Sequence, residues 1–312
     1  MYMAFPRLFI PLFFGVAAFS MAVTPESVRE NVRTLAGQAG KGNGEALYNL
    51  ARLHDIGYDS IPVDSARSTA LYLEAARKGN AKAMNYLGFR YFKGEYVDRD
   101  IDSALFWLSK AVEAGDPGAA NNLGYLYASG NVVERDYAKA REWFGIAAEA
   151  GIHSAEAQLA DLFCEGLGGE TDTIGALKLY RKAVRGGIRE AGIKRAELLK
   201  SMADAGDARA MALLGDAYAR GEGVSYNHQL STEYFLKGAL GGEPSAAFVI
   251  AELLEIFPDA FSEKKYSDII LSTVEDEEIR KEMLSPQYWY EKAASSGITN
   301  AEEAALNLNS EH

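Results

Sequence analysis

The sequence predicts an all-α protein, a solenoid of helix–turn–helix repeats, and two observations carry this prediction. First, the chain repeats itself every 36 residues: residues 80–115 align without a gap on residues 116–151, and Leu87 meets Leu123. Second, apolar residues within each repeat recur three and four positions apart, as they do along one side of a helix. Neither helix of such a pair can bury its apolar side alone, so neighbouring repeats must stack.

The two helices of a repeat can be traced in residues 80–115. In the first helix, Leu87 lies on the apolar side, and Gly88 marks a place where a neighbouring helix comes close. Gly94 is expected to end this helix, because glycine enters the left-handed region without steric cost. Asp100 is expected to begin the second helix by accepting its free amides. The equivalent residues in later repeats are Asp136 and Asp172.

Tryptophan occupies one register of the second helix, at Trp107, Trp143 and Trp289. This recurrence predicts that all three side chains lie in the core. Trp143→Ala would then empty a site between stacked helices and destabilise the fold strongly.

These residues resemble the Sel-one-like repeat (SLR), a relative of the tetratricopeptide repeat (TPR) with a longer loop between its helices. The residues that match its pattern are Ala83, Leu87, Gly88, Tyr91, Gly94, Asp100, Ala104, Trp107, Lys110, Ala111 and Gly115. A second clear copy lies at 207–242, and a poorer copy at 42–79 has His54 in place of the tyrosine. The resemblance implies a right-handed α/α superhelix whose first helices line the concave side.

Two irregularities interrupt the array. Residues 188–206 are shorter than a full repeat and are expected to form one long or kinked helix. Residues 255–286 contain an insertion with its own charge pattern. We therefore expect an N-terminal array at 23–187, made of a capping helix and four repeats, and a C-terminal array at 207–312.

Residues 1–22 have the features of a cleaved secretory signal peptide. Arg7 precedes an apolar run, and small residues stand before a cleavage point after Ala22. The run is shorter than the roughly 20 residues of a membrane-spanning helix, so the mature chain is expected to have no stable membrane insertion. An uncleaved interfacial helix is the alternative. The single Cys164 suits an oxidising compartment, and we expect a periplasmic or secreted protein.

Composition and motifs argue against several classes of function. The net charge of −12 repels phosphate backbones, so nucleic-acid binding is not expected. One cysteine and four histidines support neither a disulfide framework nor a histidine-rich metal site. The chain contains no Walker, Gly-x-Ser-x-Gly or His-Glu-x-x-His motif. The sequence therefore predicts a protein that is not an enzyme and has no cofactor.

The candidate binding residues lie opposite the packing side of the first helices. On the helical wheel Asn85, Phe89 and Phe92 fall there, and the resemblance places this side on the concave face. Asparagine amides can bind a peptide backbone, and aromatic rings supply contact area. The alternative is that the aromatic residues only pack against the next repeat. The full set, called the first-helix residues below, is Asn85, Phe89, Phe92, Asn121, Tyr125, Asp161, Asp216 and Arg220.

The resulting functional hypothesis is a scaffold that binds another protein or an extended peptide. The acidic chain would favour a partner with a basic surface. Such a scaffold would act as an envelope adaptor, a regulator or an immunity protein against a secreted effector. The alternatives are a cell-wall or antibiotic-directed hydrolase of the Sel-one-like type and a eukaryotic lumenal quality-control adaptor.

Overall fold

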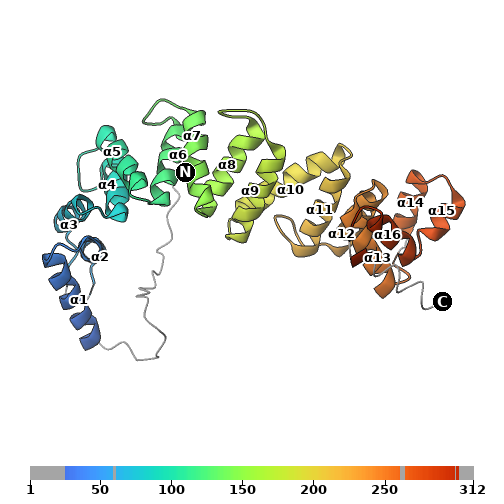
Figure 1. The fold of residues 1–312 in the computed structure, drawn as a ribbon, viewed down its shortest axis with the longest axis horizontal. Coiled ribbons are helices and arrows are strands. Elements are labelled where there is room, and N and C mark those ends of the chain that lie inside the picture. The colour runs from blue at the N-terminus through green and yellow to red at the C-terminus, as the bar shows by residue number, and fades with distance from the viewer. Residues whose placement is uncertain (1–24, 59–60, 261–263, 299, 302–312) are drawn as a thin grey trace. The chain divides into compact units, whose positions relative to one another are not determined.

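The computed structural model describes residues 25–58, 61–260, 264–298 and 300–301 (Figure 1). The proposed signal peptide, residues 1–22, lies outside this part of the chain. The described residues form sixteen helices and one isolated β-bridge, between Tyr58 and Ile61. The prediction of an all-α fold made of paired-helix repeats is confirmed.

The helices group into two compact units, residues 1–100 and 101–312. The helices of the first unit are α1 (Pro25–Gly40), α2 (Gly44–Ile56), α3 (Ser65–Arg77) and α4 (Ala81–Lys93). Within this unit α1 packs on α2, α2 on α3, and α3 on α4. The capping helix α1 thus covers the first repeat, α2–α3, and α4 is the first helix of the second repeat.

The second unit continues with the second helix of that repeat, α5 (Ile101–Glu113), and two complete pairs. The pairs are α6 (Pro117–Ser129) with α7 (Tyr137–Glu149), and α8 (His153–Glu165) with α9 (Thr173–Arg185). The shortened repeat forms the single helix α10 (Arg189–Asp204). Because α10 packs between α9 and α11 (Ala208–Arg220), it occupies the place of a first helix.

The C-terminal part of the second unit contains the insertion. The pair α11–α12 (His228–Leu240) is followed by α13 (Pro244–Ile256), and α16 (Pro286–Ala294) packs against α13. Along the chain, α13 and α16 are separated by α14 (Lys264–Thr273) and the short α15 (Glu277–Glu282). α14 contacts α12, where Lys265 and Glu233 form an ion pair at 2.5 Å.

Aspartate side chains begin two of the second helices, α7 and α9, as expected. Asp136 accepts a hydrogen bond from the Lys139 amide at 3.0 Å, and Asp172 accepts one from the Gly175 amide at 2.8 Å. The bond from the Lys139 amide lowers the pKa of Asp136. The loop ahead of these second helices is held in a recurrent way. The backbone amide of the residue just before the second helix donates a hydrogen bond to the backbone carbonyl oxygen of the aromatic residue near the end of the first helix. The donor and acceptor pairs are Asp100 and Tyr91, Asp136 and Tyr127, Asp172 and Phe163, and Asn227 and Tyr218.

The core between α6 and α7 is centred on Phe144, which is 1% exposed. Its ring lies over Gly124, where a Cβ atom would be 2.6 Å from the ring. The prediction that Trp143 and Trp107 are core residues is wrong, because both are only half-buried. Each stands one position, about 100° around the helix, from a buried residue, Leu108 or Phe144. Trp143 covers the edge of the cluster that Phe144 fills.

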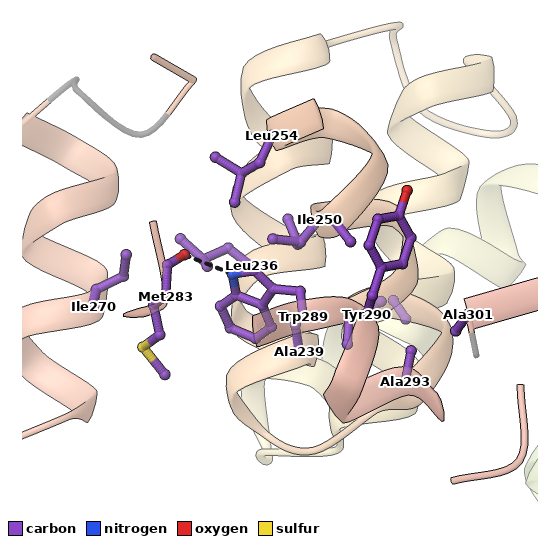
Figure 2. Packing of buried hydrophobic residues seen from close by; sticks show 14 of the residues in the cluster. Leu236, Ala239, Ile250, Leu254, Ile270, Met283, Trp289, Tyr290, Ala293 and Ala301 are labelled. Atoms are coloured by element: carbon purple, nitrogen blue, oxygen red, sulfur yellow. Dashed lines mark hydrogen bonds between the residues drawn. The ribbon is translucent and has the colours of Figure 1, made fainter. Parts of the chain in front are cut away.

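Trp289 is fully buried, as predicted, because the insertion covers it. Its indole nitrogen donates a hydrogen bond of 2.8 Å to the carbonyl oxygen of Met283 (Figure 2). Met283 and Ile270 belong to the same buried cluster, together with Ile250 and Leu254 of α13. The insertion therefore supplies part of the C-terminal core.

Candidate functional site

The first-helix residues of the first unit form an aromatic pair on α4. The ring centroids of Phe89 and Phe92 lie 6.5 Å apart, and the ammonium group of Lys93 lies 5.7 and 5.5 Å from them. Both rings and Asn85 are half-buried. The rings therefore pack on each other while keeping part of their surface accessible.

In the second unit, α6 presents Asn121 and Tyr125. The Asn121 side-chain oxygen accepts a hydrogen bond of 3.3 Å from Ser154 of α8, so this amide lies beside the next first helix. Tyr125, one helical turn further along, is 54% exposed. An amide and a large exposed aromatic ring thus lie next to each other, which is a combination suited to contact with a protein surface.

Asp161 of α8 forms contacts with side chains of two neighbouring helices. Its carboxylate accepts hydrogen bonds from the Tyr180 hydroxyl at 2.6 Å and from the Lys194 ammonium at 2.8 Å. Burial, together with this carboxylate, raises the pKa of Tyr180. Asp161 therefore ties α8 to both α9 and α10. The repeat pattern gave no signal for this contact, because Lys194 lies in the irregular repeat.

Asp216 and Arg220 pair with each other on the surface of α11. Their carboxylate and guanidinium groups are 2.8 Å apart, and this contact raises the pKa of Arg220. The pair is solvent-exposed on the guanidinium side, so it contributes little to stability. It offers a partner one charge of each sign.

An acidic register runs along the first helices of the second unit from α8 onward. The ninth residue of each helix is Tyr125 in α6, and then Asp161, Glu197, Asp216 and Glu252 in α8, α10, α11 and α13. Glu197 and Glu252 are exposed and were missed by the sequence analysis. Glu197 and Glu252 would have been found by aligning the sequences of α10 and α13 with those of the first helices in the regular repeats.

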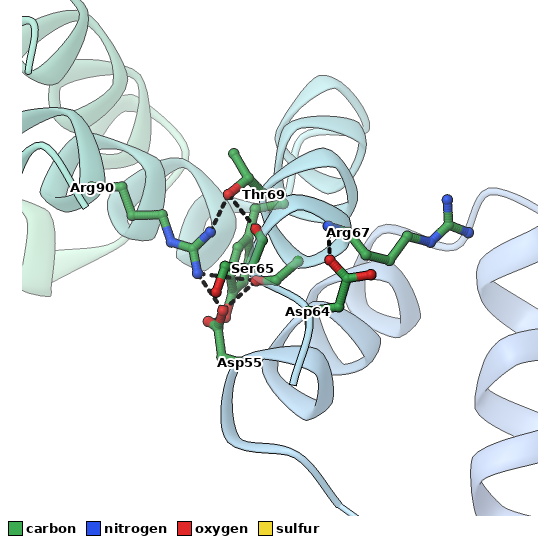
Figure 3. Close-up of polar contacts among 8 residues, drawn as sticks. Asp55, Asp64, Ser65, Arg67, Thr69 and Arg90 are labelled. Atoms are coloured by element: carbon green, nitrogen blue, oxygen red, sulfur yellow. Dashed lines mark hydrogen bonds and ion pairs between the residues drawn. The ribbon is translucent and has the colours of Figure 1, made fainter. Parts of the chain in front are cut away.

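A second polar arrangement, also missed, is buried in the first unit between α2, α3 and α4 (Figure 3). The Arg90 guanidinium, with the residue only 2% exposed, forms an ion pair with Asp55 and donates to the hydroxyls of Thr69 and Ser68. The Tyr72 hydroxyl donates to the other Asp55 oxygen at 2.9 Å. We call these five residues the Arg90 cluster.

Tyrosine rings surround the guanidinium of the Arg90 cluster. Its central carbon lies 5.0 Å from the Tyr72 ring centroid, 5.9 Å from that of Tyr86 and 5.1 Å from that of Tyr96. Burial and the nearby Asp55 raise the pKa of Tyr72. Tyr96 adopts a positive φ of 63°, which is rare for a residue other than glycine. Since its groups are paired and enclosed, the cluster joins the first repeat to the second.

The chemistry available elsewhere in the described residues is limited. No group of three histidine, cysteine, aspartate or glutamate side chains lies close enough together there to hold a metal ion. Burial is the main cause of the raised pKa of the Cys164 thiol, which disfavours the reactive thiolate. Among the same residues, none of the helices combines the length and apolar character needed to cross a membrane.

The stacked helix pairs and their exposed polar and aromatic residues define a helical repeat scaffold. The Sel1 repeat family matches the chain at residues 44–80, 81–116, 117–152, 153–188, 208–243 and 287–298. The chain belongs to this family. The family resemblance and the all-α repeat fold are thereby confirmed.

Comparison with individual proteins gives one relative from sequence and several from structure. The chain is 39% identical over 72 residues to the ERAD-associated E3 ubiquitin-protein ligase component HRD3 of Candida glabrata, which is 23% of this chain and 9% of that protein. A protective antigen of uropathogenic Escherichia coli strains with an SLR fold is 27% identical, with a TM-score of 0.50, covering 89% of this chain and 59% of the antigen. A Sel1 repeat protein from Oxalobacter formigenes is 22% identical, with a TM-score of 0.49, covering 81% of this chain and 94% of that protein. The chain thus spans less than two thirds of the length of HRD3 and of the protective antigen.

Proposed function

We propose that this Sel1 repeat protein is a non-enzymatic scaffold that binds another protein through the exposed side of its first helices. The observation that best supports the proposal is the exposure of Tyr125 beside Asn121 on α6. Tyrosine is enriched among residues that dominate binding energy, because it supplies a large contact area and a hydrogen-bonding hydroxyl.

The charge of the first-helix side supports a basic partner. From α8 to α13 the ninth position of each first helix is acidic, and the whole chain carries a net charge of −12. Complementary charge speeds association, and this effect weakens as salt rises. Association with the partner is therefore faster at low ionic strength.

We further propose that the mature chain works in the periplasm or outside the cell. The support is the pattern of residues 1–22, with one basic residue, an apolar run and small residues at the cleavage point. An envelope adaptor, a regulator or an immunity protein is the role that suits such a scaffold. The match to HRD3 favours a second candidate, a lumenal adaptor in protein quality control.

Two double variants, one in each unit, test the binding proposal. A partner is first captured with the purified chain. Asn121→Ala with Tyr125→Ala in α6, or Asn85→Ala with Phe89→Ala in α4, should then weaken the affinity for this captured partner at least about tenfold. Helical content measured by circular dichroism should stay nearly unchanged. Isothermal titration calorimetry with the purified partner measures the affinity.

The matched control removes exposed apolar side chains from second helices. Phe106 of α5 is 54% exposed, as Tyr125 is, and Ile146 of α7 is 39% exposed. Their double alanine variant should bind as tightly as the unchanged protein. If both first-helix variants keep full affinity, or if the control loses as much, the partner does not bind at the first helices.

A further inference from the structure

A cavity of about 260 Å³ opens between α11, α12 and α13 in the second unit. Its floor includes Ser231, Thr232 and Ile250, which are all buried. Its mouth is formed by exposed residues, among them Tyr226 and His228. Among the lining side chains, the Thr232 hydroxyl lies 3.5 Å from Nδ1 of His228, at the long end of the hydrogen-bond range.

This cavity is the repeat equivalent of the Arg90 cluster. The helices α2, α3 and α4 have the same lengths as α11, α12 and α13, and the residues can be matched by their position in each helix. The matched pairs are Asp55 with Ala219, Ser68 with Ser231, Thr69 with Thr232, Tyr72 with Phe235, Tyr86 with Val249, and Arg90 with Leu253. All six partners in the second unit line the cavity.

The serine and threonine are kept, whereas the ion pair that fills the first copy is absent from the second. Arg90 extends from α4 into the first copy and meets Asp55 there. In the second copy the shorter Leu253 and Ala219 stand at those two positions. The loss of the guanidinium and the carboxylate accounts for the open space. In the first unit, the Arg90 side chain fills the corresponding space.

The lining selects a neutral occupant with an apolar body and one polar end. Phe235, Val249 and Leu253 give apolar walls, while Ser231 and Thr232 place hydroxyl groups on the floor. A cation would lack the carboxylate that Asp55 supplies in the first copy, and an unpaired buried charge is costly. A cavity of about 150 Å³ already admits benzene, so this larger one has room for a phenol ring.

We propose that the cavity between α11, α12 and α13 receives a tyrosine side chain of the partner protein. This inference rests on the proposed function, since it names the side chain by which a partner would engage the C-terminal repeats. The ring fills the space that Arg90 fills in the first copy, and the phenol hydroxyl exchanges hydrogen bonds with Ser231 and Thr232. Tyrosine is preferred to phenylalanine because phenylalanine would leave the floor hydroxyls without that partner.

The test uses the purified full chain and three small probes, N-acetyl-tyrosinamide, N-acetyl-phenylalaninamide and N-acetyl-argininamide. Ligand-observed NMR titration should show the tyrosine probe binding with a Kd on the order of 1 mM. The phenylalanine probe should bind about threefold to tenfold more weakly, and the arginine probe should show no saturable binding. Absence of tyrosine binding, or equal binding of all three probes, would overturn the inference.

Two sets of variants locate the binding. Ala219→Asp with Leu253→Arg rebuilds the ion pair of the first copy inside the cavity and should abolish probe binding. Ser231→Ala with Thr232→Val keeps the volume, and it should remove the preference for tyrosine over phenylalanine without unfolding α12. If the second variant keeps the preference, the floor hydroxyls do not bind the phenol and the inference is wrong. Because the probes replace the partner, these results are independent of the affinity measurements that test the proposed function.

Discussion

Arg90→Ala is expected to lower the free energy of unfolding by about 3–5 kcal/mol, because it leaves the Asp55 carboxylate without its buried counter-charge. The loss also removes hydrogen bonds to Ser68 and Thr69 and the contact with the Tyr72 ring. Urea denaturation followed by circular dichroism measures the effect. A loss below about 1 kcal/mol would show that the Arg90 cluster does not hold α4 against α2 and α3.

The matched control uses the pair of residues found in the second unit. Asp55→Ala with Arg90→Leu installs the residues that α11 and α13 carry at these positions, so neither buried charge remains. Replacing a buried ion pair by apolar residues is often neutral in stability. We therefore expect the double variant to be more stable than Arg90→Ala alone. A double variant as unstable as the single one would contradict the ion-pair account.

Phe144→Ala is expected to lower the free energy of unfolding by about 3–5 kcal/mol. The ring is buried between α6 and α7 over Gly124, and the helix backbones around it cannot fully close the space that it leaves. Trp143→Ala, its neighbour in sequence, should cost only about 1–2 kcal/mol, because the indole is half-buried at the edge of the cluster. Denaturation of both variants in parallel checks the order, and a larger loss for Trp143→Ala would contradict the described packing.

Trp143 and Phe144 show how far the sequence could predict the fold. The period of 36 residues, the glycines that end helices and the aspartates that begin them predicted the helix pairs and their order. They could not decide which aromatic residue of a second helix faces the first helix. Trp143 and Phe144 are adjacent, and the choice depends on how Gly124 lets one ring approach.

The Arg90 cluster shows a second limit. Arg90 stands at a register where α6 and α8 carry the buried residues Leu126 and Leu162, so the repeat pattern predicts an apolar residue there. A buried arginine needs Asp55 and the two hydroxyls together, and these lie on two other helices. Such a combination of side chains appears only when the helices are placed in space.

Some properties of the first-helix residues could be predicted from the sequence, and others depend on contacts between helices. Helical periodicity correctly placed Tyr125 on an exposed side of α6, because only the geometry of one helix is involved. It could not show that Asp161 is tied to Lys194, a contact that depends on the packing of α8 against the irregular α10. Local periodicity therefore identified exposed positions, and contacts between helices decided which side chains remain available to a partner.

Hydroxyl-radical footprinting of the complex with the captured partner tests the central claim most directly. Tyr125 on first helix α6 and Phe106 on second helix α5 are both aromatic, and each is 54% exposed in the free protein. Binding through the first helices predicts that oxidation of Tyr125 falls several-fold in the complex while oxidation of Phe106 stays unchanged. Protection of Phe106 with unchanged oxidation of Tyr125 would place the partner on the second helices and contradict the proposal.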